Sequence, residues 1–379
     1  MESTTTISQT PYFWIRVLLK AGFLFVGLNL IWAIFDPMPA IGKLSIYNAL
    51  IPGRVRLPYG ENPTVAYNLS LFNLPAMYAS HELSGTPKTT AEYRVILIGD
   101  SATWGYLLPP EDTLAAFINA QQLRLPDGRM LRAYNLGYPV MSLTKDVLIL
   151  SKAIEYQPDM IVWLVTLESF PRSKQLFPPL LQNNPEAVRQ LIAAHHLDLN
   201  PYDPTLIEAN FFQKTLIGQR KSVGDWLRLQ IYGIPWAATG IDQEIPDRFI
   251  PRQEDLSAEL SFHELQPPSL PENALAVDIL SAGMAIAGDV PILLINEPMF
   301  ISEGENSDLR YNFYYPRWAY NAYRDMLLRN ANEHGWHYFD FWDRINYKEF
   351  TNSAVHLSPS GTQELARLIS IAIQDFHQP

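Results

Sequence analysis

The chain contains no cysteine among its 379 residues. Without a thiol it forms no disulfide, offers no thiolate metal ligand and has no thiol nucleophile. Basic residues are also outnumbered, because 28 Lys and Arg stand against 39 Asp and Glu and give a formal net charge of -11. This negative balance argues against nucleic acid or anionic polymers as the main partners, and it suits neutral sugars or acylated glycans better.

Motifs for nucleotides and metals are missing as well. The sequence has no Walker loop and no G-x-G-x-x-G pattern, and His263-Glu264 lacks the second histidine of an H-E-x-x-H zinc motif. His334, His337 and Asp340 lie close together in the sequence, but we interpret them as structural because one ends a helix while the others lie along a strand. The sequence therefore predicts no cofactor and no bound metal.

One long hydrophobic run lies near the amino terminus. Residues 12–35 are apolar apart from Arg16, Lys20 and Asn29, and the run holds the roughly 20 residues needed to cross a bilayer. We interpret it as a transmembrane signal-anchor that follows a cytoplasmic tail, residues 1–11, because the two basic residues near its start favour an amino terminus inside the cell. The protein is then a single-pass membrane protein with its bulk outside the cytoplasm. The alternative is an amphipathic interfacial or partner-binding helix.

From residue 93 onward, apolar strands alternate with helical patterns. The expected strands are 94–98, 131–136, 160–165, 290–295 and 336–339. The expected helices are 113–123, 143–155, 272–287, 319–333 and 362–375. Such alternation predicts an α/β fold with a three-layer, parallel sheet that has helices on both faces.

Two other segments stand outside this alternation. Residues 36–92 are punctuated by Pro and Gly, so we expect a juxtamembrane linker with short strands before an α/β domain over 93–379. Residues 168–266 contain helical pieces, at 185–196 and 223–232, and scattered prolines. This stretch is too long for a simple connection, so we expect a lid inserted over the active edge of the sheet.

Two polar positions are candidates for catalysis. Gly99-Asp100-Ser101 directly follows the first strand, and the carboxyl ends of parallel strands are where catalytic groups collect, so Ser101 is a candidate nucleophile. Near the carboxyl terminus, His356 precedes the last helix in the stretch V-H-L-S-P-S-G. A histidine at this late position has the place of a general base.

The early G-D-S triplet and the late V-H-L-S-P-x-G block together resemble the SGNH (GDSL-type) hydrolase superfamily over about residues 93–378. The resemblance implies a flavodoxin-like sheet, with Ser101 as nucleophile, His356 as base and Asp100 as part of the catalytic block. It also implies an oxyanion hole that uses the N–H groups of Ser101 and Gly137, the latter in the block N-L-G.

The sequence departs from the family pattern in two places. Where the family has a G-x-N block, this chain has Thr166-Leu167-Glu168-Ser169, so Thr166 or Ser169 would supply the third oxyanion donor. The family places an aspartate three residues before the histidine, but here that position is Ser353, beside Asn352. Asp340 and Asp343 are therefore the candidates for the orienting acid. A Ser-His dyad assisted by a backbone carbonyl is the alternative.

The substrate-binding residues are expected at the same edge of the sheet. They are Thr166, Glu168, Ser169, Asn296 and Glu297, which follow the third and fourth strands. An aromatic run over 311–323 either lines a sugar-binding rim beside them or packs in the core.

The resemblance and the anchor imply an extracytoplasmic serine esterase or O-acyltransferase. The expected substrates are O-acetyl groups of a bacterial cell-surface or exported polysaccharide. The expected partners are an acylated carbohydrate, the membrane, and a membrane acyltransferase or polysaccharide-export complex, with no nucleic acid. The alternative is a non-catalytic glycan-binding or assembly subunit of an envelope-polysaccharide complex that uses the same cleft.

Overall fold

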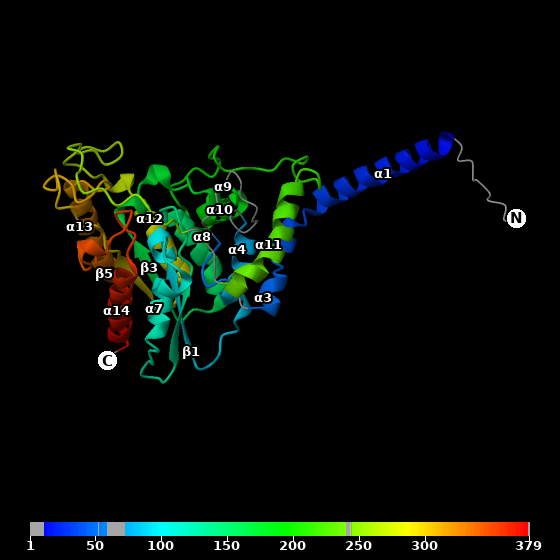
Figure 1. The fold of residues 1–379 in the computed structure, drawn as a ribbon. Helices are drawn as coiled ribbons and strands as arrows, with labels where there is room; N and C mark the ends of the chain where they lie inside the picture. Colours follow the sequence, from blue (N-terminus) through cyan, green and yellow to red (C-terminus); the bar gives the residue numbers. More distant parts are fainter. Residues whose placement is uncertain (1–10, 52, 59–72, 240–242, 244, 378–379) are drawn as a thin grey trace.

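A computed structural model describes residues 11–51, 53–58, 73–239, 243 and 245–377 (Figure 1). Residues 1–10 of the predicted cytoplasmic tail lie outside this range. Helix α1 (Pro11–Phe35) extends away from a body in which helices surround a sheet. In the described part of the chain, α1 is the one helix long and apolar enough to cross a membrane, judged by length and composition. Only 11% of its most apolar 18-residue stretch is buried, which distinguishes it from a core helix.

The sheet has five parallel strands in the order β2-β1-β3-β4-β5. Their bounds are β1 Glu92–Ile98, β2 Met130–Asn135, β3 Met160–Val165, β4 Ile292–Asn296 and β5 His337–Asp340. This is the doubly wound, flavodoxin-like order. The predicted α/β fold is therefore confirmed, and each predicted strand is present within two residues of its expected bounds.

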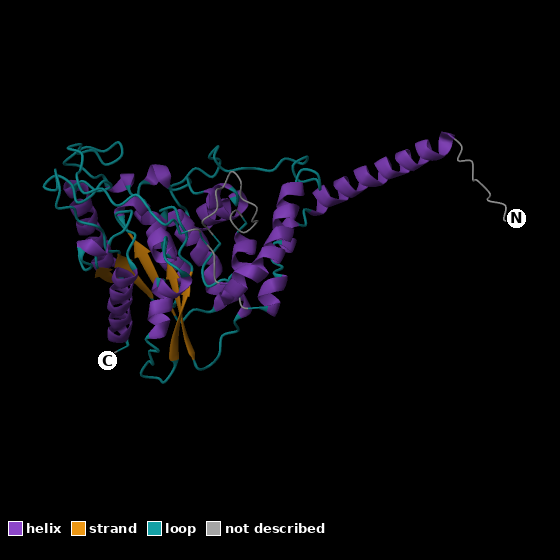
Figure 2. Cartoon of the chain, viewed as in Figure 1, coloured by secondary structure: helices purple, strands orange, loops and turns teal. Residues whose placement is uncertain are grey.

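Helices cover both faces of the sheet (Figure 2). Side chains alternate between the faces of a strand, and the core accordingly divides into two clusters. One cluster joins Ile96, Ile98 and Trp163 to the helices of one face, and the other joins Val95, Leu97 and Val162 to the helices of the opposite face. The first face carries α8 (Leu143–Ala153), α10 (Pro185–His195), α12 (Val277–Ala287) and α13 (Arg317–His334). The second carries α7 (Leu114–Ala120) and α14 (Pro359–Phe376).

The segment 36–92 differs from the expected linker with short strands. Its described residues form helices α2 (Met38–Ile41), α3 (Ile46–Leu50), α4 (Leu74–Ala79) and α5 (Glu82–Gly85), with isolated bridges at Arg54 and Arg56. Asn73 caps α4 and a proline occupies its first turn, a combination that starts helices rather than strands. Buried His81 joins this segment to β2, because its Nε2 lies 3.0 Å from the carbonyl oxygen of Asn135.

Buried Arg56 extends this contact to the turn that carries the candidate nucleophile. Its guanidinium donates to the carbonyl oxygens of Gly105, at 2.8 Å, and Leu108, at 2.9 Å. The same group lies 4.0 Å from the ring centre of Trp104, whose indole N–H donates to the carbonyl oxygen of Leu57. Part of the expected linker thus packs as a layer of the α/β body.

The described residues of the segment 168–266 pack against several different parts of the protein. Its first residues border the candidate site, whereas α10 packs against the helical layer on the sheet. The short helix α9 (Pro179–Gln182) contacts both α8 and α10, and α11 (Arg220–Thr239) packs against α3. The part of this segment that borders the site is therefore short.

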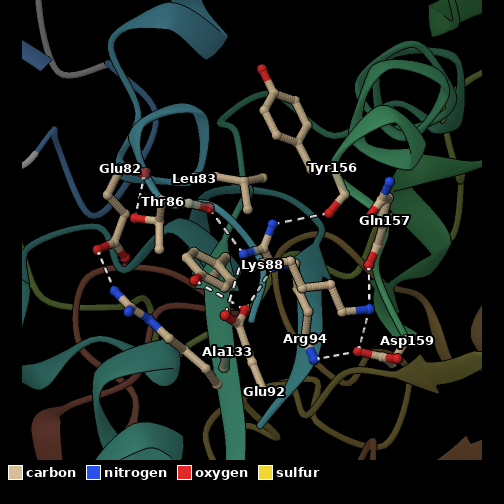
Figure 3. A network of polar contacts seen from close by, with 12 residues as sticks. Glu82, Leu83, Thr86, Lys88, Glu92, Arg94, Ala133, Tyr156, Gln157 and Asp159 are labelled. Atoms are coloured by element: carbon tan, nitrogen blue, oxygen red, sulfur yellow. Dashed lines mark hydrogen bonds and ion pairs between the residues drawn. The ribbon is translucent and has the colours of Figure 1, made fainter. Parts of the chain in front are cut away.

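A polar network lies at the amino end of β1 (Figure 3). The Arg94 guanidinium donates to Glu92 Oε1 at 2.6 Å and to the carbonyl oxygens of Tyr156 and Thr86, each at 3.0 Å. The Arg94 backbone N–H donates to Asp159, which also pairs with Lys88. These contacts fix the start of the strand whose other end carries Ser101.

Candidate active site

The candidate nucleophile lies in a tight turn after β1. A Cβ at Gly99 would lie 2.2 Å from Thr103 Oγ1 and 3.1 Å from the carbonyl oxygen of Leu164, so only glycine fits there. Asp100 then caps the short helix α6 (Ser101–Trp104) by accepting from the Ala102 N–H at 2.7 Å. This local sequence places Ser101 at the carboxyl end of β1, as the first residue of a helix.

Ser101, His356 and Asn352 form a hydrogen-bonded chain. Ser101 Oγ lies 2.8 Å from His356 Nε2, and His356 Nδ1 lies 2.9 Å from Asn352 Oδ1. An amide oxygen only accepts hydrogen bonds, so the Nδ1 atom carries the imidazole proton and Nε2 is left to accept from the serine hydroxyl. This is the tautomer that a general base for a serine nucleophile requires.

The loop before α14 holds His356 in place. The Thr351 N–H donates to the carbonyl oxygen of His356 at 2.9 Å, and Phe350 forms a bridge with Leu357. Burial lowers the pKa of His356 from 6.5 to about 4, because a buried imidazolium loses its hydration. The imidazole is therefore neutral at neutral pH and ready to accept a proton.

The two predicted orienting acids lie elsewhere. Asp340 accepts from Arg324 Nη2 at 2.6 Å and from Asn296 Nδ2 at 2.8 Å, so its carboxylate is occupied. Asp343 borders a separate surface pocket beside Met299. The prediction of Asp340 or Asp343 as the partner of His356 is wrong, because Asn352 takes that position.

Gly137 has a different role from the one predicted. Its N–H donates to Asn135 Oδ1 at 3.0 Å and is therefore occupied. A Cβ at this position would lie 2.4 Å from the backbone nitrogen of Trp104, so glycine is required for the loop after β2 to pack against α6. In this arrangement Gly137 does not serve as an oxyanion donor, and the Ser101 N–H, at the start of α6, is the remaining backbone candidate.

Of the block after β3, only Glu168 reaches the pocket. Thr166 is fully buried with its hydroxyl 2.9 Å from Tyr315 OH, and Ser169 is also buried. Neither lines the cavity, so neither replaces the missing oxyanion donor. Glu168 binds Lys174 and His263, the latter at 2.9 Å. Burial opposes its charge, but these two hydrogen bonds outweigh burial and hold the pKa of Glu168 below its ordinary value.

Asn296 and Glu297 are buried rather than exposed to substrate. Asn296 Oδ1 accepts from Tyr320 OH at 3.3 Å and Tyr323 OH at 3.2 Å. Glu297 is 2% exposed and lies against Asp100. The prediction that these two residues bind substrate is therefore wrong, although they do follow the strand beside the site.

A buried charged cluster lies beneath the candidate nucleophile. It contains the carboxyl groups of Asp100, Asp146 and Glu297 and one cation, Lys145, which is fully buried. Burial raises the pKa of Glu297 well above its ordinary value, and the neighbouring carboxylates of Asp100 and Asp146 raise it further. Lys145 Nζ donates to the carbonyl oxygens of Gly99, at 2.8 Å, and Tyr138, at 2.7 Å. It thereby joins the two loops that border the site.

The pocket over Ser101 has a volume of about 580 Å³. Its lining combines apolar and aromatic side chains with a few polar groups: Ser101, Tyr106, Pro139, Val140, Met141, Glu168, Lys174, Phe177, Tyr314 and His356. The ring of Tyr106 lies 4.9 Å from that of His356. From the aromatic run 311–323, Tyr314 reaches the pocket, whereas Tyr315, Tyr320 and Tyr323 pack in the core.

Two non-glycine residues beside the site have left-handed backbone angles. Val140 lines the pocket with a φ of 72°, and Leu107 follows α6 with a φ of 65°. For a β-branched residue such as Val140 this angle is a genuine outlier, and strained residues of this kind cluster at functional sites. Within the described residues, no group of three or more His, Asp or Glu side chains is placed to hold a metal ion.

No protein-family model and no curated protein matches this sequence. Among solved structures, the chain is similar to a carbohydrate acetylesterase family member from Sinorhizobium meliloti, with 12% identity, a TM-score of 0.34, and 75% of this chain and 98% of that chain covered. The aryl esterase of M. smegmatis gives 12% identity and a TM-score of 0.32, with 74% and 98% covered. An alpha/beta hydrolase enzyme from the metagenome of Lake Arreo, Spain, has 15% identity and a TM-score of 0.33, with 74% of this chain and 94% of that chain covered. Scores this low carry no argument about function, which therefore depends on the site itself.

Proposed function

We propose that this protein is a membrane-anchored serine esterase or O-acyltransferase of the SGNH type. The observation that carries the proposal is the chain Ser101–His356–Asn352, with links of 2.8 and 2.9 Å, at the wall of a pocket of about 580 Å³. A serine hydroxyl hydrogen-bonded to a neutral imidazole, itself held by a third group, is the arrangement that activates a serine for acyl transfer.

The proposed reaction has two steps. Ser101 Oγ attacks the acyl carbonyl carbon while its proton passes to His356 Nε2, and the Ser101 N–H stabilises the developing oxyanion. Collapse of this intermediate breaks the bond to the alcohol, which leaves with the proton from Nε2. Water or a sugar hydroxyl then attacks the acyl-serine in the same way and releases an acid or a new ester.

The proposed substrate is an O-acetyl ester of a cell-surface or exported polysaccharide, met outside the cytoplasm of a bacterium. Tyr106, Phe177 and Tyr314 offer rings for stacking on sugars, and Glu168 with Lys174 offers polar contacts for hydroxyl groups. The length and apolar composition of α1 support a membrane anchor. A membrane acyltransferase or a polysaccharide-export complex is the proposed partner, as a source or destination of the acyl group.

The test is hydrolysis of p-nitrophenyl acetate by the full chain in detergent. We expect Ser101→Ala to lose at least about a thousandfold in kcat/KM. Ser151→Ala is the matched control, because Ser151 lies on α8, donates to the Leu148 carbonyl oxygen and is not among the residues that line the pocket. Turnover by Ser101→Ala that equals the control would refute the proposed nucleophile.

A second candidate function is non-catalytic binding of acylated glycan in the same pocket. It is favoured by the occupied N–H of Gly137 and by an amide, Asn352, where serine hydrolases hold a carboxylate. This candidate predicts that wild type hydrolyses no ester but binds acetylated oligosaccharides, and that Tyr314→Ala weakens that binding.

A further inference from the structure

A polar side chain inside the apolar helix α1 is bound by the body of the protein. Asn29 lies within the candidate span, and its Oδ1 accepts from the backbone N–H of Ile217 at 2.9 Å. The Asn29 amide N–H donates to the Phe25 carbonyl oxygen at 2.9 Å. An amide in a membrane span is costly unless it is hydrogen-bonded, and here a loop of the body supplies the bond.

Further contacts hold the same loop against the end of α1. The indole N–H of Trp32 donates to Gln219 Oε1 at 2.7 Å, and Gln219 Nε2 donates to Asp36 Oδ1 at 3.1 Å. Lys214 pairs with the other oxygen of Asp36 at 3.3 Å. The loop is residues 211–219, directly before α11, and Figure 1 shows α1 leaving the body beside α11.

These contacts fix the level of the loop along the helix. Asn29 lies six residues before Phe35, which corresponds to about 9 Å at ~1.5 Å per residue. The candidate span has 24 residues, or about 36 Å, against a hydrocarbon core of about 30 Å. If α1 crosses a bilayer with its span centred, about 3 Å of helix extends beyond each side of the hydrocarbon. Asn29 and the Ile217 backbone then lie about 6 Å inside the hydrocarbon edge, and Asp36, which follows the span, lies at the headgroups.

The same loop exposes large apolar side chains. Phe212 is 70% exposed, Phe211 54% and Ile217 38%. Arg220, at the start of α11, is exposed beside them. Aromatic side chains next to a cation, at the edge of the hydrocarbon core, are the chemistry that docks a protein segment into a lipid surface.

We propose that residues 211–219 dock into the lipid surface beside α1, with Phe211 and Phe212 among the acyl chains and Arg220 at the phosphate level. The occupant of this apolar surface is the bilayer, and the argument is its continuity with the span through Asn29, Trp32 and Asp36. The docked loop restricts how the body pivots on its anchor and so sets the distance of the pocket from the membrane. This inference depends on the proposed membrane location and is independent of the proposed chemistry.

The absence of cysteine makes a direct test possible. Single-cysteine variants of the full chain, each carrying a nitroxide, are placed in nanodiscs of phosphatidylcholine and phosphatidylglycerol (3:1), and collision with oxygen is compared with collision with a water-soluble nickel chelate. The test position is Phe212→Cys. Leu24→Cys, on the exposed surface of α1, is the lipid reference. The aqueous control is Ile250→Cys, an 87% exposed apolar residue two positions before Arg252, which bonds Thr351 far from α1.

We expect the label at 212 to collide at least about threefold more with oxygen than with nickel, relative to the ratio at 250, as the label at 24 also does. A label at 212 that matches 250 while 24 reports lipid would overturn the docking and leave the anchor intact. Protection of 212 from both reagents would also overturn it, because a protein then covers the loop. If the label at 24 itself reports water, the membrane location fails, and the docking fails with it.

Discussion

The two ends of β1 bury polar groups in opposite ways. At the amino end, Arg94 lies between Glu92 and the carbonyl oxygens of Tyr156 and Thr86, and every contact joins a donor to an acceptor (Figure 3). At the carboxyl end, three carboxyl groups share one buried lysine beneath Ser101. The first arrangement holds the strand in place, whereas the second leaves an excess of negative charge that a proton bound to Glu297 reduces.

Unpartnered atoms mark the carboxyl end. Asp100 Oδ2 and Glu297 Oε1 are buried without a hydrogen-bond donor elsewhere in the described part of the chain. Burial raises the pKa of both carboxyl groups. The charges of Asp100 and Asp146 raise the pKa of Glu297 further, and the charge of Asp146 also raises that of Asp100. Titratable groups with perturbed pKa values gather at functional sites. The polar contacts at the amino end of β1 therefore stabilise the fold. The buried carboxyl groups at its carboxyl end lower the stability beside the candidate nucleophile.

The largest expected effect is at the amino end. Arg94→Met leaves Glu92 buried without its cation, so we expect the free energy of unfolding to fall by about 3–5 kcal/mol. Activity per folded molecule should be unchanged. Denaturant unfolding in detergent measures the free energy of unfolding, and Arg367→Met, which breaks a solvent-exposed pair with Glu364, is the control, with little expected change. If both variants lost the same free energy of unfolding, the buried network would contribute no more stability than the surface pair.

The next effect is at the carboxyl end, where Asn352 orients the base. We expect Asn352→Ala to lower kcat about a hundredfold, equivalent to about 2.7 kcal/mol, with KM and stability little changed. Steady-state kinetics on a soluble ester measures this. Asp343→Asn is the control because Asp343 borders another pocket. Loss of activity in Asp343→Asn with normal activity in Asn352→Ala would reverse the assignment.

The pH dependence provides a third distinction. Because burial lowers the pKa of His356 to about 4, the base stays neutral down to that pH, and the acid limb of kcat/KM should fall near 4 rather than near 6.5. The same shift means that the stability contributed by neutral His356 is complete above pH 6.5 and is lost as pH falls toward 4. Asn352→Asp adds a carboxylate that favours the imidazolium and should move the limb upward. A limb near 6.5 in the wild type would contradict the buried, neutral base.

The smallest expected effect concerns the proton that Glu297 holds in the folded protein. The raised pKa of Glu297 means that the folded protein holds a proton that the unfolded chain releases above pH 4.5, so stability falls as pH rises beyond that value. Glu297→Gln removes this dependence, and the curve of unfolding free energy against pH should be flatter between pH 5 and 8. Denaturant unfolding at four pH values measures the slope. An unchanged curve in the variant would show that Glu297 is already ionised when folded.

Much of the fold follows from local patterns. The run Val95-Ile96-Leu97-Ile98 is a strand because its apolar side chains are covered on both faces, and the glycine after it permits the turn to Ser101. The segment 36–92 was harder to predict, because Pro and Gly occur in linkers and also at the starts and ends of short helices. Contacts such as that of Arg56 with the Gly105 carbonyl join residues distant in sequence and leave no local pattern.

The candidate site was predicted in part. The pair Ser101 and His356 was predicted from where strands end and helices begin, together with the two sequence blocks that resemble SGNH hydrolases. The structure brings the two side chains together at 2.8 Å. Asn352 was missed because the path of the loop over 351–356, closed by the Thr351 N–H, decides which side chain reaches Nδ1. Glu297 was placed at the correct edge of the sheet, but its burial depends on Asp100 and Lys145 from other elements.

The most direct test of the active serine is labelling of the full chain with a fluorophosphonate, which reacts with activated serines and not with ordinary ones. Wild type, Ser101→Ala, His356→Ala and Ser151→Ala are compared after each is shown to be folded. If the carboxyl end of β1 carries a working Ser-His pair, wild type and Ser151→Ala are labelled and the other two are not. Absence of labelling in folded wild type, or labelling that survives in Ser101→Ala, would contradict the proposed esterase and leave glycan binding as the function of the pocket.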